Sequence, residues 1–565
     1  MTLVEYLVKR LIENKVTDVF GIPGGAVLPF LYEVQKHSPL ITPRLSFHEQ
    51  AAAFSAAGYA QSNGELGVVY ATRGPGITNT LTAVADAYYE SVPLLVITAH
   101  NFRGKRSTRR IDENQELDAT NVFKTVTKAT IKIKKISSAS NLIDCCINLA
   151  LDGRKGPVLL DIDKSLFNCD IKPNSKINEQ SRHIVQHNLI KQEWDNVLTE
   201  LKKSRRPILL IGDGIRQSST NELLSKITNK IRIPIISSRY TQDLQKNNPI
   251  YFGYLGSHGL RYTNFILSKT DFIIVFGNNL NFPDQSVTFR KVFSKAKVRR
   301  FDIDERELVR SLENLKDVKV DLRQLFSFLL KERFLFTADE EWLNCCSELK
   351  SKLFLSDVNE PIEKISKILA KIPREASIVS DVGNNEFWLC RAYALSNCDN
   401  KILFSKSFGA MGSSIPKAIG IYYDTLRPVI SFNGDQAFQM NIQELQAISN
   451  SNLPITVVIV NNSSSGMIRT RQINSYSSNF LQTTIKSGYS NPSFKNIANA
   501  YGFHYFLLSS SNSNDLTNID FNIKNIIEVQ ISDQFDLFPS IKIGDDCQNM
   551  YPYLDKDLYQ YLDNM

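Results

Sequence analysis

Short apolar runs alternate with longer segments of helical periodicity along most of the chain. In the first part, residues 67–71, 94–98 and 157–162 form apolar runs typical of buried parallel strands. Residues 49–61 and 79–89 lie between these runs and have the composition of helices. This alternation predicts a doubly wound parallel sheet.

The same alternation restarts twice further along the chain. Apolar runs that end in polar or glycine residues recur at 207–214, 233–238, 272–279, 298–304, 376–383, 428–435, 455–462 and 526–531. Residues 168–190 are polar without periodicity, and residues 330–358 are charged and helical, so both are interpreted as linkers. The sequence therefore predicts an α/β fold with three doubly wound parallel-sheet domains and a short C-terminal tail. We place these parts at residues 1–167, 186–330, 358–545 and 546–565.

The composition is that of an ordinary globular protein. Apolar residues make up 42% and charged residues 22% of the chain, and the formal net charge of +8 is mild for 565 residues. The densest basic stretch, residues 103–110, is interpreted as a solvated loop because no basic stripe with aromatic residues accompanies it. We therefore expect no nucleic-acid partner.

The N-terminal segment and the cysteines indicate the compartment. Residues 1–16 have apolar side chains at helical spacing with charges between them, which predicts an amphipathic helix rather than a signal peptide. No apolar run reaches the roughly 18 residues that a membrane span needs. The eight cysteines include no CxxC pair, so reduced thiols are expected. We expect a soluble, cytoplasmic protein that does not bind membranes.

Two strand ends in the last domain carry oxygen ligands. The run PVISFNGD ends in Gly434 and Asp435, and the next run, ITVVIVNN, ends in Asn462. We expect Gly434 to permit a tight turn that places Asp435 at the carboxyl edge of the sheet, where open α/β sheets bind ligands. The segment NIQELQAI between them predicts a helix, so both strand ends meet at one edge. Carboxylate and amide oxygens suit Mg²⁺ that also binds phosphate oxygens.

Gly-Asp followed by a later Asn-Asn resembles the cofactor motif of thiamin-diphosphate enzymes. The words FQMNIQELQAISNSNLPITVVIVNN and GMI are similar to acetohydroxyacid (acetolactate) synthases. The resemblance implies that Asp435, Asn462 and the carbonyl of Ser464 hold Mg²⁺. It implies cofactor contacts for Gly434, Gln436, Ala437, Asn462, Gly466 and Met467. Gln436 stands where the strict motif has a second glycine.

The first domain contains the word HEQAAAFSAAGYA, which resembles the synthases' segment around their catalytic glutamate. The resemblance implies that Glu49 contacts the cofactor's aminopyrimidine and starts the chemistry. The segment IDENQELD aligns Gln115 with an active-site glutamine, and Asn114 replaces the usual phenylalanine.

Glycine-rich loops of the first domain complete this resemblance. The word FGIPGGAVLPF resembles the loop over the reacting carbon and implies that Pro23 contacts the cofactor. Gly24 and Gly25 would bring amide donors to a developing oxyanion. The word TRGPGITN resembles a loop that precedes a helix and adds Gly74 to the cofactor contacts.

The segment SFGAMGSSIPKAIG of the last domain resembles the synthases' Leu-Gly-Thr-Met-Gly segment. By this resemblance Met411 is the bulky side chain that bends the cofactor, and the Gly409 carbonyl accepts from its amino group. Asn384 and Asn385 occupy the place of a Gln-His pair that contacts the diphosphate.

The resemblance spans nearly the whole chain and implies an assembly. Glu49 belongs to the first domain and the Asp435–Asn462 pair to the third, and in this family the two come from different chains. The active site would therefore lie at a subunit interface, with a homodimer as the smallest active unit and a homotetramer common.

The middle domain resembles the synthases' FAD domain in part. Residues 255–256, His258 and residues 302–304 match its segments, whereas Asn278 and Asn279 stand where the flavin-binding arginine is expected. Whether the chain binds FAD stays open on this pattern.

Departures from the resemblance lead us to expect an acceptor substrate that differs from that of housekeeping synthases. Arg471 stands where those enzymes carry the tryptophan that selects the second keto acid, and Arg469 lies nearby. Two arginines favour an anionic or polyhydroxylated acceptor. The ending QNMYPYLDKDLY resembles relatives found with surface-polysaccharide genes, which implies a keto-sugar or another carbonyl as the acceptor.

The leading hypothesis is an acetolactate-synthase-like carboligase. It would decarboxylate pyruvate or a related 2-keto acid and transfer the two-carbon unit to a second carbonyl, a keto acid or keto-sugar. One alternative is a 2-keto-acid decarboxylase without carboligation, although the adjacent His-His pair common in those enzymes is missing. Another is a catalytically silent relative that acts as a binding protein, against which Glu49, Asp435 and Asn462 argue.

Overall fold

The computed structural model describes most of the chain. The described residues are 1–101, 114–172, 187–280, 286–307, 314–509, 516 and 518–565, with only the backbone described at 286–288 and 290. The basic stretch expected to form a solvated loop, residues 103–110, lies outside these ranges.

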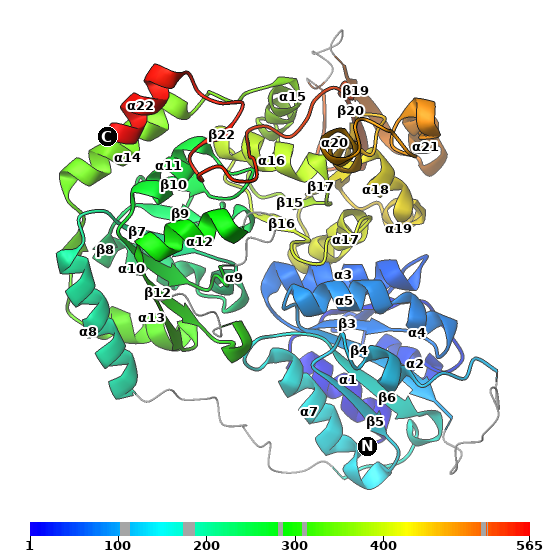
Figure 1. Cartoon of the computed structure of the whole chain (residues 1–565). Coiled ribbons are helices and arrows are strands. Elements are labelled where there is room, and N and C mark those ends of the chain that lie inside the picture. The colour runs from blue at the N-terminus through cyan, green and yellow to red at the C-terminus, as the bar shows by residue number, and fades with distance from the viewer. Residues whose placement is uncertain (102–113, 173–186, 281–285, 308–313, 510–515, 517) are drawn as a thin grey trace. The chain divides into compact units, whose positions relative to one another are not determined.

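The chain, which Figure 1 colours by residue number, divides into two compact units, each made of three segments. Unit 1 comprises Met1–Arg182, Glu375–Glu386 and Leu403–Asp533. Unit 2 comprises His183–Arg374, Phe387–Ile402 and Gln534–Met565.

The first sheet of unit 1 has six parallel strands. In spatial order they are β2 (Thr42–Leu45), β1 (Asp18–Gly21), β3 (Gly67–Tyr70), β4 (Leu94–His100), β6 (Val158–Asp163) and β5 (Ala129–Ile133). Its helices are α1 (Leu3–Glu13), α2 (Leu28–Lys36), α3 (Glu49–Asn63), α4 (Pro75–Asn79), α5 (Leu81–Tyr89), α6 (Ala119–Phe123) and α7 (Ala139–Leu151), with short turns η1 (Ile136–Ser138) and η2 (Lys164–Leu166). Strands β3, β4 and β6 are buried along their whole length, as their continuous apolar runs predict.

Local sequence signals set the boundaries of the N-terminal helix α1. Thr2 caps the helix through a reciprocal bond pair with Glu5, a capping box that satisfies two otherwise orphaned amides. The buried residues Leu3, Leu7 and Leu11 recur at helical spacing on one face. The amphipathic helix expected within residues 1–16 is therefore confirmed.

The second sheet of unit 1 also has six strands, and β15, β17, β18, β20 and β19 pair in parallel. In spatial order they are β16 (Ile402–Phe404), β15 (Ser377–Ser380), β17 (Val429–Gly434), β18 (Ile455–Asn461), β20 (Asn525–Gln530) and β19 (His504–Leu508). Its helical segments are α16 (Asn384–Leu395), α17 (Ser414–Thr425), α18 (Asp435–Met440), η6 (Ile442–Glu444), α19 (Leu445–Asn450), α20 (Gly466–Ser475), η7 (Ile485–Ser487) and α21 (Phe494–Tyr501). Helix α16 starts in unit 1 and continues into unit 2.

The segment NIQELQAI does not form the single helix that its pattern predicts. Asn441 leaves helical geometry, with φ −133° and ψ 37°, and the chain continues through the 3₁₀ turn η6 before α19 begins. Two of its polar side chains bond to other segments instead: Asn441 donates to the Gly412 carbonyl, and Glu444 accepts from the amide of Phe47.

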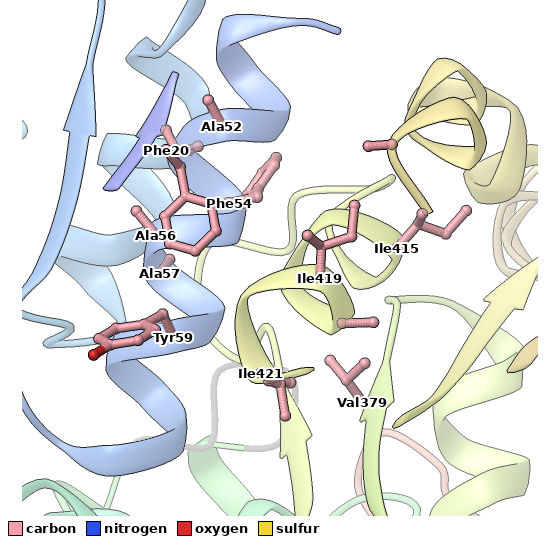
Figure 2. Close-up of a cluster of buried hydrophobic side chains, with 14 of the residues drawn as sticks. Phe20, Ala52, Phe54, Ala56, Ala57, Tyr59, Val379, Ile415, Ile419 and Ile421 are labelled. Atoms are coloured by element: carbon pink, nitrogen blue, oxygen red, sulfur yellow. The ribbon is translucent and has the colours of Figure 1, made fainter. Parts of the chain in front are cut away.

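The two sheets of unit 1 share one hydrophobic core through α3 and α17. These helices approach closely because Gly58 and Gly420 have no side chain: a Cβ on either would overlap the backbone of the other helix. The hydroxyl of Ser55 donates to the Pro416 carbonyl across the crossing at 2.9 Å. Figure 2 shows side chains of β1 and α3, such as Phe54, on one side and side chains of α17 and β15, such as Ile419, on the other.

Unit 2 contains the third parallel sheet. In spatial order its strands are β10 (Tyr251–Tyr254), β9 (Ile235–Ser237), β7 (Pro207–Ile211), β11 (Phe272–Phe276), β12 (Lys297–Asp302) and β13 (Leu315–Lys319). Two small pairs are β8 (Ile231–Arg232) with β14 (Phe336–Thr337), and β21 (Ser540–Ile541) with β22 (Met550–Tyr551). Its helices are α8 (His187–Lys203), α9 (Gly214–Gln217), α10 (Asn221–Lys230), η3 (Arg239–Thr241), α11 (Arg261–Lys269), α12 (Ser286–Lys295), η5 (Glu305–Glu307), α13 (Leu322–Lys331), α14 (Glu340–Leu353), α15 (Glu360–Leu369) and α22 (Lys556–Asn564).

The predicted fold class is confirmed, because three parallel α/β sheets are present. Among the described helices, none combines the length and the apolar character that crossing a membrane requires.

Candidate functional site

The carboxylate of Asp435 lies buried where β17 passes into α18. Its Oδ1 accepts from the phenol of Tyr489 at 2.8 Å and from the backbone amide of Gln436 at 3.0 Å. Its Oδ2 accepts from Nδ2 of Asn491 at 2.8 Å. Burial raises the pKa of Asp435, and the hydrogen bonds from Asn491 and Tyr489 oppose this shift. The side chain of Gln436 is exposed and that of Ala437 is buried. Gln436 contacts Asp435 through its backbone amide.

The asparagine pair lies at the end of the neighbouring strand, β18. Since β17 and β18 are parallel neighbours in register up to Gly434 and Val460, the two strand ends meet at the same edge of the sheet. Asn462 is 7% exposed there. Its neighbour Asn461 accepts from the amide of Ser463 and from Nδ2 of Asn491, both at 3.1 Å. The structure therefore brings together the two strand ends predicted to hold a metal.

Tyr489 and Asn491 are functional candidates that the sequence pattern did not indicate. They follow Asp435 by 54 and 56 residues, in a segment without a recognisable motif. Asn491 bridges Asp435 and Asn461, so it fixes the distance between the two strand ends. Ser464, whose carbonyl the resemblance assigns to the metal, is buried, and its hydroxyl donates to the Thr483 carbonyl at 2.8 Å.

A cradle of amide groups surrounds Gly466, the first residue of α20. A Cβ at this position would stand 2.5 Å from Nδ2 of Asn384 and 2.9 Å from Nδ2 of Asn462. Both polar side-chain atoms of Asn384 are buried, and neither has a hydrogen-bond partner among the described residues. Such a group is costly to bury unless a ligand completes its bonds. Two amide nitrogens beside a helix N-terminus suit a phosphate group.

Other residues near the cradle differ from the expectation in detail. The chain turns directly from β17 into α18 here, but Gly434 has φ −74° and ψ 159°, an extended conformation open to any residue, so the turn does not require a glycine. Nδ2 of Asn385 donates to the Asp381 carbonyl at 3.0 Å, and its Oδ1 would stand 3.5 Å from a Cβ on Gly434. Met467, on α20, is 45% exposed. Asn384 is therefore the member of the Asn384–Asn385 pair that faces the cradle.

Glu49 is the first residue of α3, and loops of the first sheet converge on it. Its Oε2 accepts from Nδ2 of Asn79 at 2.9 Å. A Cβ on Gly76 would stand 3.3 Å from Oε1 of Glu49 and 2.7 Å from Thr72. A Cβ on Gly24 would stand 2.5 Å from Thr72. The glycines therefore allow the 23–25 and 72–76 loops to pack beside the glutamate.

The other predicted loop residues, Pro23, Gly25, Gly74 and Gln115, belong to the loops around Glu49. Gly74 has φ +66°, and a Cβ there would stand 2.8 Å from the carbonyl oxygen of Gln115. Gln115 itself has φ +59° and an exposed side chain. Pro23 and Gly25 are exposed, and no atom lies within 4 Å of a Cβ placed on Gly25.

The carboxylate of Asp381 binds the backbone at the end of the 409–412 segment. The carboxylate of Asp381 accepts from the amides of Gly412 at 3.1 Å and Ser414 at 3.0 Å. Burial raises the pKa of Asp381 to about 6. Gly409 has φ +70° and Gly412 φ +81°, so left-handed backbone flanks Met411, which is partly exposed. Asp381 was not singled out in the sequence, because it looks like an ordinary strand-end aspartate.

Two side chains tie the start of α3 to the segment after Asp435. Nδ2 of Asn441 donates to the Gly412 carbonyl at 2.7 Å and to Oε1 of Gln50 at 3.3 Å. Glu444 accepts from the amide of Phe47 at 2.9 Å. Burial raises the pKa of Glu444 to about 7.

The predicted catalytic residues form two groups within the chain. Glu49 belongs to the loop group of the first sheet, and Asp435 and Asn462 belong to the second sheet. Among the described residues, no hydrogen bond joins Glu49 to either of them.

The two arginines proposed to select the acceptor lie on α20. Arg469 has its guanidinium carbon 5.7 Å from the centroid of the Phe480 ring. Arg471 is exposed. Both follow the cradle residue Gly466 on the same helix.

Comparisons with known proteins agree along the chain. Three family models match: the N-terminal TPP binding domain of thiamine pyrophosphate enzymes at residues 1–122, their central domain at 194–326 and their C-terminal TPP binding domain at 381–527. The acetolactate synthase large subunit of Lactococcus lactis subsp. lactis is 32% identical, over 96% of this chain and 94% of that protein. The chain belongs to the thiamine pyrophosphate enzyme family.

Two further relatives come from distant organisms. The probable acetolactate synthase large subunit of Methanocaldococcus jannaschii is 31% identical over 88% of this chain and 86% of that protein. The acetolactate synthase large subunit of Cyanidium caldarium is 30% identical over 89% of this chain and 88% of that protein. The resemblance drawn from the sequence motifs is confirmed at the level of the family.

The cradle fits the diphosphate of a thiamine pyrophosphate enzyme. The buried amide of Asn384 lacks a partner among the described residues, and Gly466 leaves room in front of it. The oxygen-rich set of Asp435, Asn462 and the Ser464 carbonyl has the chemistry that Mg²⁺ prefers.

The described turn at residues 278–280 of unit 2 is the place where the resemblance to the FAD domain expects a flavin-binding arginine. The Asn278 side chain accepts from the amide of Leu280 at 2.8 Å, and the Asn279 carbonyl accepts from buried Arg300 at 2.9 Å. The Asn278 side-chain oxygen and the Asn279 carbonyl of this turn are therefore occupied by bonds within the protein. Asp302 accepts from the amide of Ile303 at 2.7 Å. Within residues 255–258, burial lowers the pKa of His258 to about 4.

Proposed function

We propose that this protein is a thiamin-diphosphate- and Mg²⁺-dependent carboligase of the acetolactate-synthase type. It decarboxylates pyruvate or a related 2-keto acid and transfers the two-carbon unit to a second carbonyl acceptor. The observation that carries this proposal is the Asn384–Gly466–Asn462 cradle beside the buried Asp435. The names of the relatives, acetolactate synthase large subunits, support the reaction class.

The second sheet of unit 1 would hold the cofactor. Asn384 and the backbone start of α20 at Gly466 would bind the diphosphate, while Asp435, Asn462 and the Ser464 carbonyl would hold Mg²⁺. When bound, thiamin diphosphate supplies a carbon nucleophile and an electron sink for the decarboxylation of 2-keto acids. Tyr489 and Asn491 orient the Asp435 carboxylate for the metal.

Glu49 would hold the proton that the reaction moves at its first step. The hydrogen bond from Asn79 to Oε2 orients the carboxylate, and Gly76 leaves its Oε1 accessible from the loop side. The 23–25 loop packs against Thr72, beside the same group, where the amides of Gly24 and Gly25 would stabilise negative charge on a substrate oxygen.

The acceptor would be anionic or polyhydroxylated. Arg469 and Arg471 follow the cradle on α20, and guanidinium groups bind carboxylates and phosphates through paired hydrogen bonds. A keto-sugar or a keto acid meets this requirement.

Product analysis tests the proposed reaction. The protein is incubated with pyruvate, Mg²⁺ and thiamin diphosphate, and the products are identified by mass spectrometry, without and with keto-sugars. Acetolactate, or a sugar that has gained a two-carbon unit, is the expected result. Acetaldehyde and CO₂ as the products under every acceptor condition would identify a decarboxylase instead. No pyruvate consumption would favour a catalytically silent binding protein.

The active site would be shared between two copies of the chain. Large apolar side chains are exposed on unit 1 at Leu45, Phe47, Tyr89, Phe408 and Met440, and these would be covered by a partner. Mixing the inactive variants Glu49→Gln and Asp435→Asn tests this arrangement. Partial activity should return in the mixture, because one site of a mixed dimer takes both intact residues. A mixture that forms mixed dimers and stays inactive would contradict a shared site.

We also propose that the reaction proceeds without FAD. Decarboxylation followed by carbon–carbon bond formation involves no net oxidation or reduction, and the 278–280 turn is occupied by the protein's own bonds. The purified protein should lack flavin absorbance and keep full carboligase activity. A flavin that co-purifies, and whose removal abolishes activity, would overturn this proposal.

A further inference from the structure

One end of helix α5 in unit 1 contacts the segment that leads into Gly409. Asp86, Tyr89 and Glu90 lie at helical spacing on α5 or directly after it. All three contact residues of the second sheet's domain, between Ser405 and Lys417. We refer to residues 405–412 as the cofactor segment, because Gly409 and Met411 are its proposed cofactor contacts.

Glu90 binds the backbone of the cofactor segment. Its Oε1 accepts from the amide of Lys406 at 2.7 Å and also from the amide of Ser407. The ammonium group of Lys406 lies 3.5 Å from Oε2 of Glu90. The Glu90 side chain is fully buried, and burial raises its pKa while Lys406 opposes the shift. One carboxylate thus fixes two consecutive peptide units just before Phe408 and Gly409.

Asp86 forms a second buried contact with the same domain. Its Oδ2 lies 2.9 Å from the ammonium of Lys417, and its Oδ1 accepts from the hydroxyl of Ser405 at 2.5 Å. The Lys417 side chain is 0% exposed and that of Asp86 1% exposed. A buried ion pair of this kind depends on its geometry, because a displaced partner would leave a charge without compensation.

Tyr89 packs on the exposed side of these charges. Its ring stacks on the ring of Phe408 with centroids 5.5 Å apart and planes 7° apart. Three contacts from one helix end therefore hold residues 405–408, directly before Gly409. Gly409 has φ +70°, and a glycine can adopt many other backbone conformations at little cost, so its conformation depends on the residues before it.

We propose that Glu90 is a positioning residue for cofactor binding, which sets the cofactor segment from the first domain. This inference rests on the proposed function of Gly409 and Met411. Asp86, with Lys417, and Tyr89, with Phe408, support the same segment on either side. The first domain thereby contributes to cofactor affinity within its own chain, in addition to the proposed role of Glu49.

A purely structural role would predict a different pattern of effects. Loss of Glu90 would then lower thermal stability and leave the cofactor affinity of the folded protein unchanged. A positioning role predicts weaker cofactor binding at a temperature where the variant is fully folded. It also predicts rescue by glutamine, because an amide oxygen can still accept from the amides of Lys406 and Ser407.

Calorimetric titration of the full-length protein with thiamin diphosphate, at saturating Mg²⁺, tests the proposal. Glu90→Ala should raise the dissociation constant roughly tenfold or more, since two hydrogen bonds to a charged acceptor are lost. Glu90→Gln should restore most of the affinity. Asp18→Asn is the matched control. Asp18, at the start of β1, is a buried carboxylate of the same unit and pairs with Arg44.

The outcomes separate this inference from the proposed function. If the wild-type protein does not bind thiamin diphosphate, the proposed function fails. If it binds and a folded Glu90→Ala variant binds equally well, the positioning role of Glu90 is overturned. Should Glu90→Ala not fold, Tyr89→Leu keeps both carboxylates and, measured with protein of the same oligomeric state as the wild type, should still weaken binding through the lost stacking on Phe408. Wild-type affinity in that variant would count against the proposal.

Discussion

Gly466 lies directly against Asn384, so that a Cβ added to Gly466 would stand 2.5 Å from the amide nitrogen of Asn384. Side-chain atoms do not approach one another this closely. The space in front of a buried amide therefore depends on one missing methyl group, and the proposed diphosphate site depends on that space.

Replacing Gly466 with alanine should weaken thiamin diphosphate binding by roughly tenfold or more, because the methyl group displaces Asn384 or the cofactor itself. Calorimetric titration measures the change. Gly156→Ala is the matched control, since a Cβ there meets the flexible side chain of Lys128 at 3.1 Å. Equal affinity in Gly466→Ala and wild type would rule out the cradle as the diphosphate site.

Replacing Asp435 with asparagine should raise the Mg²⁺ concentration needed for cofactor binding by at least about 100-fold, since changes to outer-shell partners alone cost roughly 10- to 100-fold. Titrating Mg²⁺ at fixed thiamin diphosphate gives the half-saturation point. Asp545→Asn is the control, because Asp545 also accepts from a tyrosine, Tyr553, but on the surface of unit 2. An unchanged half-saturation point in Asp435→Asn would exclude Asp435 as a metal ligand.

The buried carboxyl of Asp381 should make stability depend on pH. Its pKa in the fold is about 6, above the ordinary 3.8, so the folded protein keeps a proton that the unfolded chain releases. This contribution is present at low pH and is lost as the pH rises from about 4 to about 6. The melting temperature of the wild type should therefore fall relative to that of Asp381→Asn across this window. A difference that stays constant across the window would contradict the shifted pKa.

Arg471 should affect the binding of the acceptor substrate and not the binding of the donor, pyruvate. Arg471→Gln is expected to raise the KM for an anionic acceptor by up to about fivefold, the size of an exposed ion pair, while the KM for pyruvate stays constant. Steady-state kinetics with both substrates varied gives the two values. Arg427→Gln, at another exposed arginine of unit 1, serves as the control. Equal effects on both KM values would place Arg471 outside the acceptor site.

The sequence predicted the buried strands well because continuous apolar runs leave little alternative. Strands β4 and β17 follow such runs closely. Strand β2, with the sequence TPRL, and strand β13, with LKDVK, are edge strands with polar side chains, so no apolar pattern indicated them. Pairing with a neighbouring strand, rather than local composition, makes these segments strands.

The candidate site was predictable where it follows strand ends and glycine loops. Asp435, Asn462 and Glu49 stood at recognisable positions of the chain. Glu90 did not, because its partner Ser407 is 317 residues away and the bond depends on how two domains pack. Tyr489 and Asn491 were equally hidden, since only the fold brings them to Asp435.

The proposed reaction depends on Glu49, so the turnover of Glu49→Gln with pyruvate is measured alongside its affinity for thiamin diphosphate. We predict that carboligation is abolished while the cofactor still binds with near wild-type affinity, because glutamine keeps the shape of the side chain but cannot take up the proton. Glu65→Gln, a glutamate of the same domain outside the proposed site, should keep full activity. Wild-type turnover in Glu49→Gln would overturn the proposed role of Glu49 and the reaction that depends on it.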